Sequence, residues 1–117
     1  MKSILTVIAA ALACAPAFAQ DVSISKHNGK EATAAEAAQC VAYYRAEAKL
    51  HRPANAPFEE TLRGQAWKSY LDSLNSGIDP RTLIAKSEKD MAAALAKSKT
   101  DWRKPYETSC SEFEKIS

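Results

Sequence analysis

Apolar residues recur at intervals of three and four positions along most of the chain after residue 32, which is the spacing of one face of an α-helix. No stretch in this region alternates convincingly between apolar and polar residues, as a half-buried strand would. Helix-favouring Ala, Glu, Lys, Leu and Arg are abundant, and the whole chain has only 3 glycines. We therefore predict an all-α fold, with a single domain of four helices over residues 33–117.

The first predicted helix begins at Thr33 and ends near Arg52. Thr33 and Glu36 have the spacing of a capping box, in which each side chain accepts a hydrogen bond from the backbone amide of the other residue. Pro53 disfavours helical conformation in the residue before it, so the helix should stop there. Its apolar stripe comprises Ala37, Cys40, Val41, Tyr44 and Ala48, widened by Tyr43 and Leu50.

The second predicted helix starts after Asn55 and ends at Gly77. Pro57 suits a first helical turn, and glycine readily adopts the left-handed conformation that ends many helices. Its apolar row comprises Phe58, Leu62, Ala66 and Tyr70, with Trp67, Leu71 and Leu74 beside it.

The third predicted helix has Asp79 as its N-cap and Pro80 as its first residue. Thr100 or Asp101 could cap the fourth helix, and Pro105 must lie in or before its first turn. The apolar stripes comprise Leu83, Ile84, Met91, Ala94 and Leu95 in the third helix, and Tyr106, Ser109, Cys110, Phe113 and Ile116 in the fourth.

Residues 1–19 have the three parts of a secretory signal peptide. Lys2 provides the positive charge, residues 4–13 form an uncharged run, and an Ala-Phe-Ala sequence provides the cleavage site. The run is shorter than the roughly 20 apolar residues of a membrane span, so we predict no transmembrane segment. Cleavage after Ala19 would deliver the protein to the periplasm, or to the medium. An alternative is a lipoprotein that carries its lipid on Cys14.

Residues 20–32, between the signal and the first helix, are mostly polar and show no helical pattern of apolar positions. They include Asn28 and Gly29, a pair that favours turns. We predict a flexible N-terminal arm with at most a short extended piece at Val22 to Ile24.

The chain has 3 cysteines, and Cys14 leaves with the signal. An oxidising compartment then favours a disulfide between Cys40 and Cys110, which would join the first helix to the fourth. The alternative is a pair of buried free thiols. In a regular up-and-down bundle these two positions would differ in height by more than a disulfide tolerates. We therefore predict a small, irregular four-helix array stapled by this bond.

The charges of the chain are nearly balanced. The full chain has 16 Lys and Arg against 14 Asp and Glu, a net charge of +2, and removal of Lys2 with the signal lowers it by one. This balance excludes a protein that coats nucleic acid, so we predict no nucleic-acid partner. Cys-x-x-Cys, Cys-x-x-Cys-His, His-Glu-x-x-His, Gly-x-Ser-x-Gly and glycine-rich phosphate loops do not occur. We therefore predict no cofactor and no catalytic residues of a recognisable kind.

The 2 histidines are the first residues to consider as ligands or bases. His27 lies in the predicted arm, where nothing would hold it in a catalytic geometry. Glu47 and His51 lie four residues apart on one helical face and could share a metal ion. The simpler interpretation is that His51 interacts with the carbonyl end of the first helix, because two ligands do not make a metal site.

Aromatic rings with polar edges are candidates for contact with a partner. The predicted stripes bury Tyr44, Tyr70 and Tyr106, where these rings would fill a core otherwise built of alanine and leucine. We expect the other three such rings to be partly exposed and to bind a partner: Tyr43, Trp67 and Trp102.

Trp102 also lies in the one local excess of positive charge, within residues 86–104 and next to Arg103 and Lys104. With Lys99, these two basic residues complete the predicted partner-binding set. Such a segment could meet an acidic protein or an anionic surface of the cell envelope. The alternative is a helix face that is charged only because water covers it.

Together these features favour a non-catalytic periplasmic or secreted helical protein that acts by binding another protein. Small periplasmic chaperones, inhibitors and envelope accessory proteins have the same architecture. One alternative is a carrier that holds a small ligand in an aromatic pocket between helices. Another is an enzyme of unrecognised type that uses Glu47, His51 or other acidic residues.

Overall fold

The computed structural model describes residues 21–53, 55–98 and 101–116. These residues form four helices and two short strands, in agreement with the predicted all-α class. The predicted signal peptide, with Cys14, lies outside the described residues. In chain order the elements are β1 (Val22–Ile24), α2 (Ala34–His51), α3 (Leu62–Ser73), α4 (Pro80–Lys97), α5 (Arg103–Ser111) and β2 (Glu114–Ile116).

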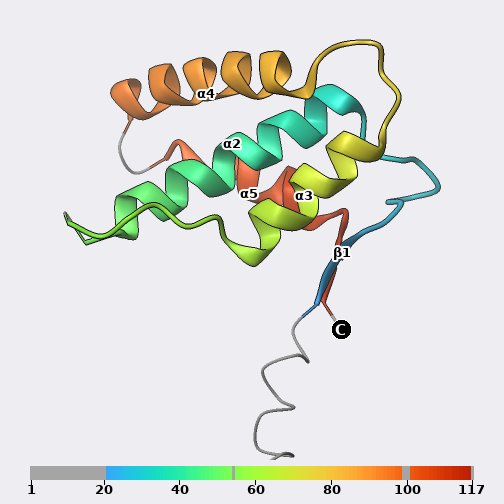
Figure 1. Ribbon diagram of the computed structural model, residues 1–117, viewed down its shortest axis with the longest axis horizontal. Coiled ribbons are helices and arrows are strands. Elements are labelled where there is room, and N and C mark those ends of the chain that lie inside the picture. The colour runs from blue at the N-terminus through green and yellow to red at the C-terminus, as the bar shows by residue number, and fades with distance from the viewer. Residues whose placement is uncertain (1–20, 54, 99–100, 117) are drawn as a thin grey trace, which may run out of the picture.

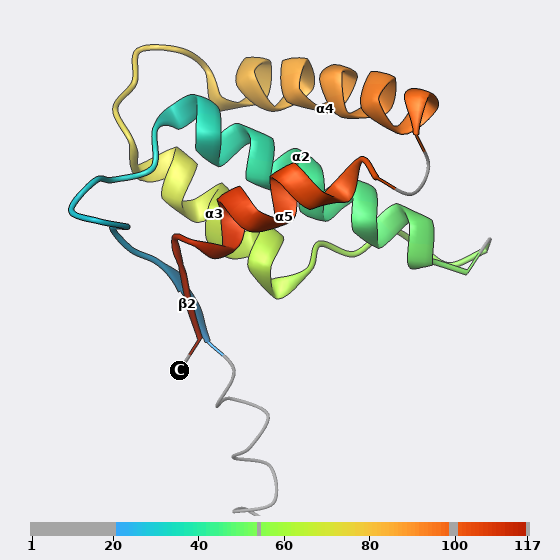
Figure 2. The same cartoon turned by 180° about the vertical axis from the view of Figure 1, so that it is seen from behind.

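Helix α2 is the central element of the fold. The predicted capping box begins it: the Thr33 amide donates to Glu36 Oε1 at 2.8 Å, and the Glu36 amide donates to Thr33 Oγ1 at 3.1 Å. Helix α4 lies along one side of α2, whereas α3 and α5 lie on the other (Figures 1 and 2). The buried residues of α2 are mostly small, and comprise Ala37, Ala38, Cys40, Val41, Ala42, Tyr43 and Tyr44.

Helix α3 differs from its prediction in both its start and its buried face. It begins at Leu62 and not directly after Asn55, because Thr61 caps it by accepting a hydrogen bond from the Gly64 amide at 3.0 Å. Trp67 and Leu71 form its buried face, since these side chains point toward α2 and the centre of the molecule. The row predicted to be buried is only half covered: Ala66 and Tyr70 are partly exposed, and Phe58 and Leu62 are exposed.

Helix α4 begins as predicted, with Asp79 Oδ1 accepting a hydrogen bond from the Arg81 amide at 2.9 Å and Pro80 in the first turn. Helix α5 begins later than predicted, with Trp102 in the N-cap position instead of Thr100 or Asp101. Thr100 itself lies outside the described residues.

The end of α5 corrects a second prediction, because the chain leaves the helix after Ser111. Phe113 and Ile116 therefore do not continue its apolar stripe. Residues 114–116 instead form β2, which pairs antiparallel with β1 with Val22 opposite Ile116 (Figure 2). The backbone groups of residues 114–116 thus form hydrogen bonds with β1 instead of the intrahelical bonds that a longer α5 would have made.

The segment predicted as a flexible arm contacts both the C-terminal strand and α3. The short extended piece at Val22 to Ile24 is strand β1. Asn28 (φ 52°) and Gly29 (φ 77°) form the tight turn that follows, with a bridge between residues 27 and 30. Beyond this turn, the Tyr70 hydroxyl donates to the Ala32 carbonyl oxygen at 2.6 Å. Residues 21–32 therefore cover part of the half-exposed row of α3.

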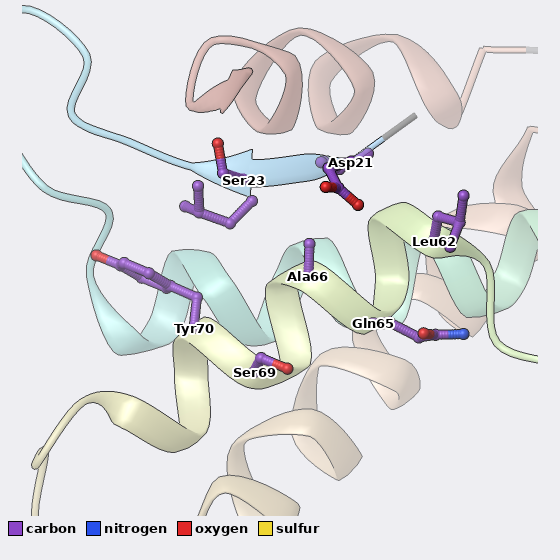
Figure 3. A pocket seen from close by; sticks show the side chains of 9 residues that line it. Asp21, Ser23, Leu62, Gln65, Ala66, Ser69 and Tyr70 are labelled. Carbon is purple, nitrogen blue, oxygen red and sulfur yellow. The ribbon is translucent and has the colours of Figure 1, made fainter. Parts of the chain in front are cut away.

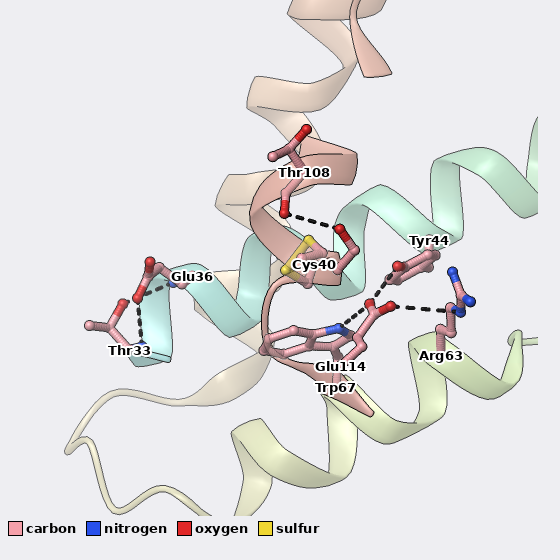
Figure 4. The surroundings of a disulfide bond; sticks show 10 residues. Thr33, Glu36, Cys40, Tyr44, Arg63, Trp67, Thr108 and Glu114 are labelled. Carbon is pink, nitrogen blue, oxygen red and sulfur yellow. Dashed lines mark hydrogen bonds and ion pairs between the residues drawn. A yellow bond between two sulfur atoms is a disulfide. The ribbon is translucent and has the colours of Figure 1, made fainter. Parts of the chain in front are cut away.

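Cys40 of α2 and Cys110 of α5 form the predicted disulfide, with their Cα atoms 5.7 Å apart (Figure 4). Both residues are buried, at 3% and 1% exposure. The bond joins the first and fourth helices of an irregular array, as predicted, and is compatible with an oxidising extracellular compartment. None of the helices within residues 21–53, 55–98 and 101–116 combines the length and the apolar character needed to cross a membrane.

Candidate functional site

The three rings predicted to be partly exposed are buried, which corrects that prediction. Tyr43 is 3% exposed, Trp67 0% and Trp102 4%. The ring of Tyr43 packs edge-on against Tyr44 and Trp102 and stacks on Tyr106. Because α2 supplies mainly alanines to the centre of the molecule, large rings from several elements fill the volume that those alanines leave.

The basic segment is held partly by ion pairing. Arg103 Nε lies 3.2 Å from Glu47 Oε2, and an amino nitrogen of the same guanidinium lies 3.4 Å from His51 Nε2. Glu47 and His51, which were considered as a possible metal pair but not predicted to form a metal site, thus both meet a positive side chain that would repel a cation. Lys104 is exposed, and Lys99 lies outside the described residues. Among the residues that the structure describes, no three His, Cys, Asp or Glu side chains cluster as metal ligands.

A buried carboxylate, which the sequence analysis missed, lies where β2 meets α2 and α3. The side chain of Glu114 is 3% exposed. The Tyr44 hydroxyl and Trp67 Nε1 both donate hydrogen bonds to its Oε2 atom, the second at 2.9 Å (Figure 4). Arg63 Nε lies 3.7 Å from the other carboxylate oxygen. These contacts compensate the buried charge and attach the C-terminal strand to two helices.

Burial also changes the ionisation of two tyrosines at the centre of the fold. Burial first and the nearby Glu47 second raise the pKa of Tyr43 to about 12. For Tyr44, burial and then its hydrogen bond to Glu114 raise the pKa well above the ordinary value of tyrosine. Both phenols are therefore neutral over the physiological range, so neither is a tyrosinate base.

We expect the protein to lose stability in alkali, from about pH 10 upward. A raised pKa in the folded state means that the unfolded chain releases the phenolic protons first, so stability is complete below about pH 10 and falls toward pH 12. Tyr43→Phe, which keeps the ring, should make this fall shallower. Urea unfolding at several pH values measures the fall in the free energy of unfolding. If this free energy fell equally steeply with pH in the variant and the original chain, the expectation would be contradicted.

A hollow on the described surface lies between β1 and α3, and we call it the β1–α3 groove (Figure 3). Its volume is about 470 Å³. Ala66 points from α3 toward the strand, and Tyr70 lies at one end of the labelled helix face (Figure 3). The lining residues are Asp21, Val22, Ser23 and Ile24 from the strand side, and Leu62, Gln65, Ala66, Ser69 and Tyr70 from α3.

Apolar side chains are exposed in the lining of the β1–α3 groove and on the neighbouring strand β2. Leu62 in its lining is 56% exposed. Ile116, which stands directly across the ladder from Val22, is 57% exposed. Large aliphatic side chains left open beside a concave surface are characteristic of contact sites.

A second cavity, of about 200 Å³, lies between α2 and α4. Its walls are mainly aliphatic, with Leu50, Met91 and Leu95 as the large side chains, and Lys49 and Glu88 at its polar side. The aromatic rings, which would line the pocket of the alternative ligand carrier, pack in or against the core.

The sequence contained part of the signal for the β1–α3 groove. The apolar row with Leu62, Ala66 and Tyr70 was recognised, and so was the extended piece at Val22 to Ile24. Whether this extended piece covers all or only part of the apolar row is determined by the pairing of β1 with β2. No local pattern indicates a contact between such distant segments.

Comparison of the chain with protein-family models, with curated proteins and with solved structures finds no match in any of the three.

Proposed function

We propose that this protein is a non-catalytic helical protein of the periplasm, or secreted beyond it, and that it acts by binding another protein. Such a role would be that of a chaperone, an inhibitor or an envelope accessory protein. The proposal rests on the β1–α3 groove, whose lining includes Leu62 at 56% exposure, and on Ile116 of the neighbouring strand β2, at 57% exposure. Burial of such side chains is the usual source of affinity in protein–protein contacts.

The contacts of the other candidate groups agree with a binding role. Glu47 and His51 contact Arg103, and Glu114 accepts hydrogen bonds from Tyr44 and Trp67. These groups thus have structural partners within the described part of the chain. The signal peptide and the disulfide favour an oxidising compartment outside the cytoplasm.

Site-specific photo-crosslinking in the source cells tests this proposal. A photoreactive phenylalanine analogue replaces Leu62 in one variant, Lys104 of the basic segment in a second, and exposed Lys89 of α4 in a third. We expect a discrete adduct of higher mass from position 62 after irradiation, and none from position 89. Irradiation without any adduct from positions 62 and 104 would contradict a role in protein binding.

An adduct from position 104 alone would keep the proposed function and assign it to the basic segment. A second control is the position-62 variant with the exposed Lys115 of β2 changed to Glu, which leaves the groove lining intact. This change should not alter the adduct, because Lys115 is not among the lining residues.

A further inference from the structure

The pairing of β1 with β2 determines which backbone groups of β1 face outward. The Ser25 amide donates to the Phe113 carbonyl oxygen at 2.8 Å, so this pair occupies a hydrogen-bonded position of the ladder. In antiparallel strands, hydrogen-bonded and non-hydrogen-bonded residue pairs alternate along the ladder. Ser23 is therefore also hydrogen-bonded to β2, and the N–H and C=O groups of Val22 and Ile24 point the other way.

This outer edge of β1 is open in the described part of the chain. The strand order there is β1–β2, and outside this ladder no backbone hydrogen bond joins Val22 or Ile24 to another described residue. Unpaired donors and acceptors along a strand edge are a template for a further strand. Charged residues or proline often prevent an edge strand from pairing with another chain. Strand β1 has the sequence Val-Ser-Ile and contains neither.

The β1–α3 groove lies along this same open edge. Residues 21–24 all line it, but no residue of β2 does, so the groove is on the side of β1 away from β2. A strand added there would lie about 4.8 Å from β1, over the flank of α3 that carries Gln65 and Ser69. Its side chains opposite Val22 and Ile24 would lie on the same face of the sheet as those two residues, which line the groove.

We infer that the β1–α3 groove binds an extended segment of another protein, which pairs with the outer edge of β1 as a third strand. The inference rests on the proposed function and specifies how the partner binds. Main-chain hydrogen bonds to Val22 and Ile24 would hold the segment, and every second side chain would enter the groove. The exposed Leu62 in the lining favours an apolar side chain at its end of the groove.

The charges around the groove specify the segment further. Asp21 is the only charged residue in the lining. At the Tyr70 end of the groove, burial and the carboxylates of Glu31 and Glu36 raise the pKa of the Tyr70 hydroxyl. The effect of the two carboxylates indicates a negative potential at this end. A segment with a lysine or arginine beside its apolar residues therefore complements the groove.

A second copy of this chain fits the groove less well than a foreign segment. In a β1–β1 pair, Val22 and Ile24 of each copy would already lie against their own α3, so neither could fill the groove of the other copy.

Selection of displayed random linear peptides on the purified, oxidised protein tests the inference. We expect the selected peptides to alternate apolar and polar residues and to carry lysine or arginine. In amide exchange, a bound peptide should protect the Val22 and Ile24 amides, whereas the Ser23 and Ser25 amides are already protected by β2. Failure to select any peptide that protects these two amides would overturn the inference.

A matched pair of variants isolates the backbone contact. Val22→Ala and Val22→Pro both remove the isopropyl group, but only proline removes the outward N–H, which the β1–β2 ladder does not use. Val22→Pro should weaken peptide binding about tenfold more than Val22→Ala. Equal affinities would overturn strand addition, and so would a concentration-dependent dimer that Val22→Pro abolishes. A crosslink from position 62 would still support the proposed function in either case.

Discussion

Replacing Cys40 and Cys110 together by alanine is expected to lower the free energy of unfolding by about 4 kcal/mol, measured by urea unfolding. The disulfide closes a span of 70 residues, and the chain-entropy model assigns a cross-link of this length a stabilisation of that size. Small domains have total stabilities of roughly 5–15 kcal/mol. The double variant should therefore be close to unfolded at moderate urea concentrations.

This expectation follows from the composition of the core as well as from the span. Alanines make up much of the buried surface of α2, so each buried residue there contributes little apolar area. Helix α5 has only nine residues and Cys110 as its buried residue. Without the disulfide, mainly the contacts of Tyr43 with Trp102 and Tyr106 hold α5 against α2.

Chemical reduction of the original protein is the matched control. Reduction should add two hydrogens to the intact mass and should lower stability by about as much as the double substitution. It should leave the stability of the double variant unchanged, because no bond remains to be broken. A double variant as stable as the oxidised protein would contradict a stabilising role for the bond.

The features that sequence reasoning predicted correctly depend on neighbouring residues. The Thr33–Glu36 capping box and the Asp79–Pro80 start are each complete within four residues, so the local sequence contains all the partners. The disulfide was predictable for a different reason, since removal of Cys14 with the signal would leave one possible pair.

The features that sequence reasoning did not predict depend on contacts between distant segments of the chain. Both rows of α3 are apolar, and the row with Trp67 faces the core, where Glu114, 47 residues away, accepts the Trp67 N–H. Strand β2 has three residues, and its partner β1 lies near the other end of the chain. Neither the buried Glu114 nor the open edge of β1 leaves a periodic pattern that could be read locally.

Trp67→Ala is expected to cost about 3–5 kcal/mol of the free energy of unfolding, the usual range for deleting a buried tryptophan side chain. The loss has two parts. One is the cavity left by a ring that is 0% exposed and packs against Tyr70 and Phe113. The other is the hydrogen bond at 2.9 Å to Glu114, whose carboxylate stays buried when its donor is removed.

Trp67→Phe separates these two parts, because phenylalanine keeps most of the ring and removes the N–H donor. Trp102→Phe is the matched control: Trp102 is also buried, at 4% exposure, but its Nε1 has no hydrogen-bond partner among the described residues. We expect Trp67→Phe to cost about 1–3 kcal/mol and Trp102→Phe clearly less. Combining Trp67→Phe with Glu114→Gln should then cost less than the two single changes together, because the buried charge is gone. Equal costs for the two Trp→Phe changes, or strict additivity with Glu114→Gln, would mean that the buried carboxylate does not hold β2 against α3.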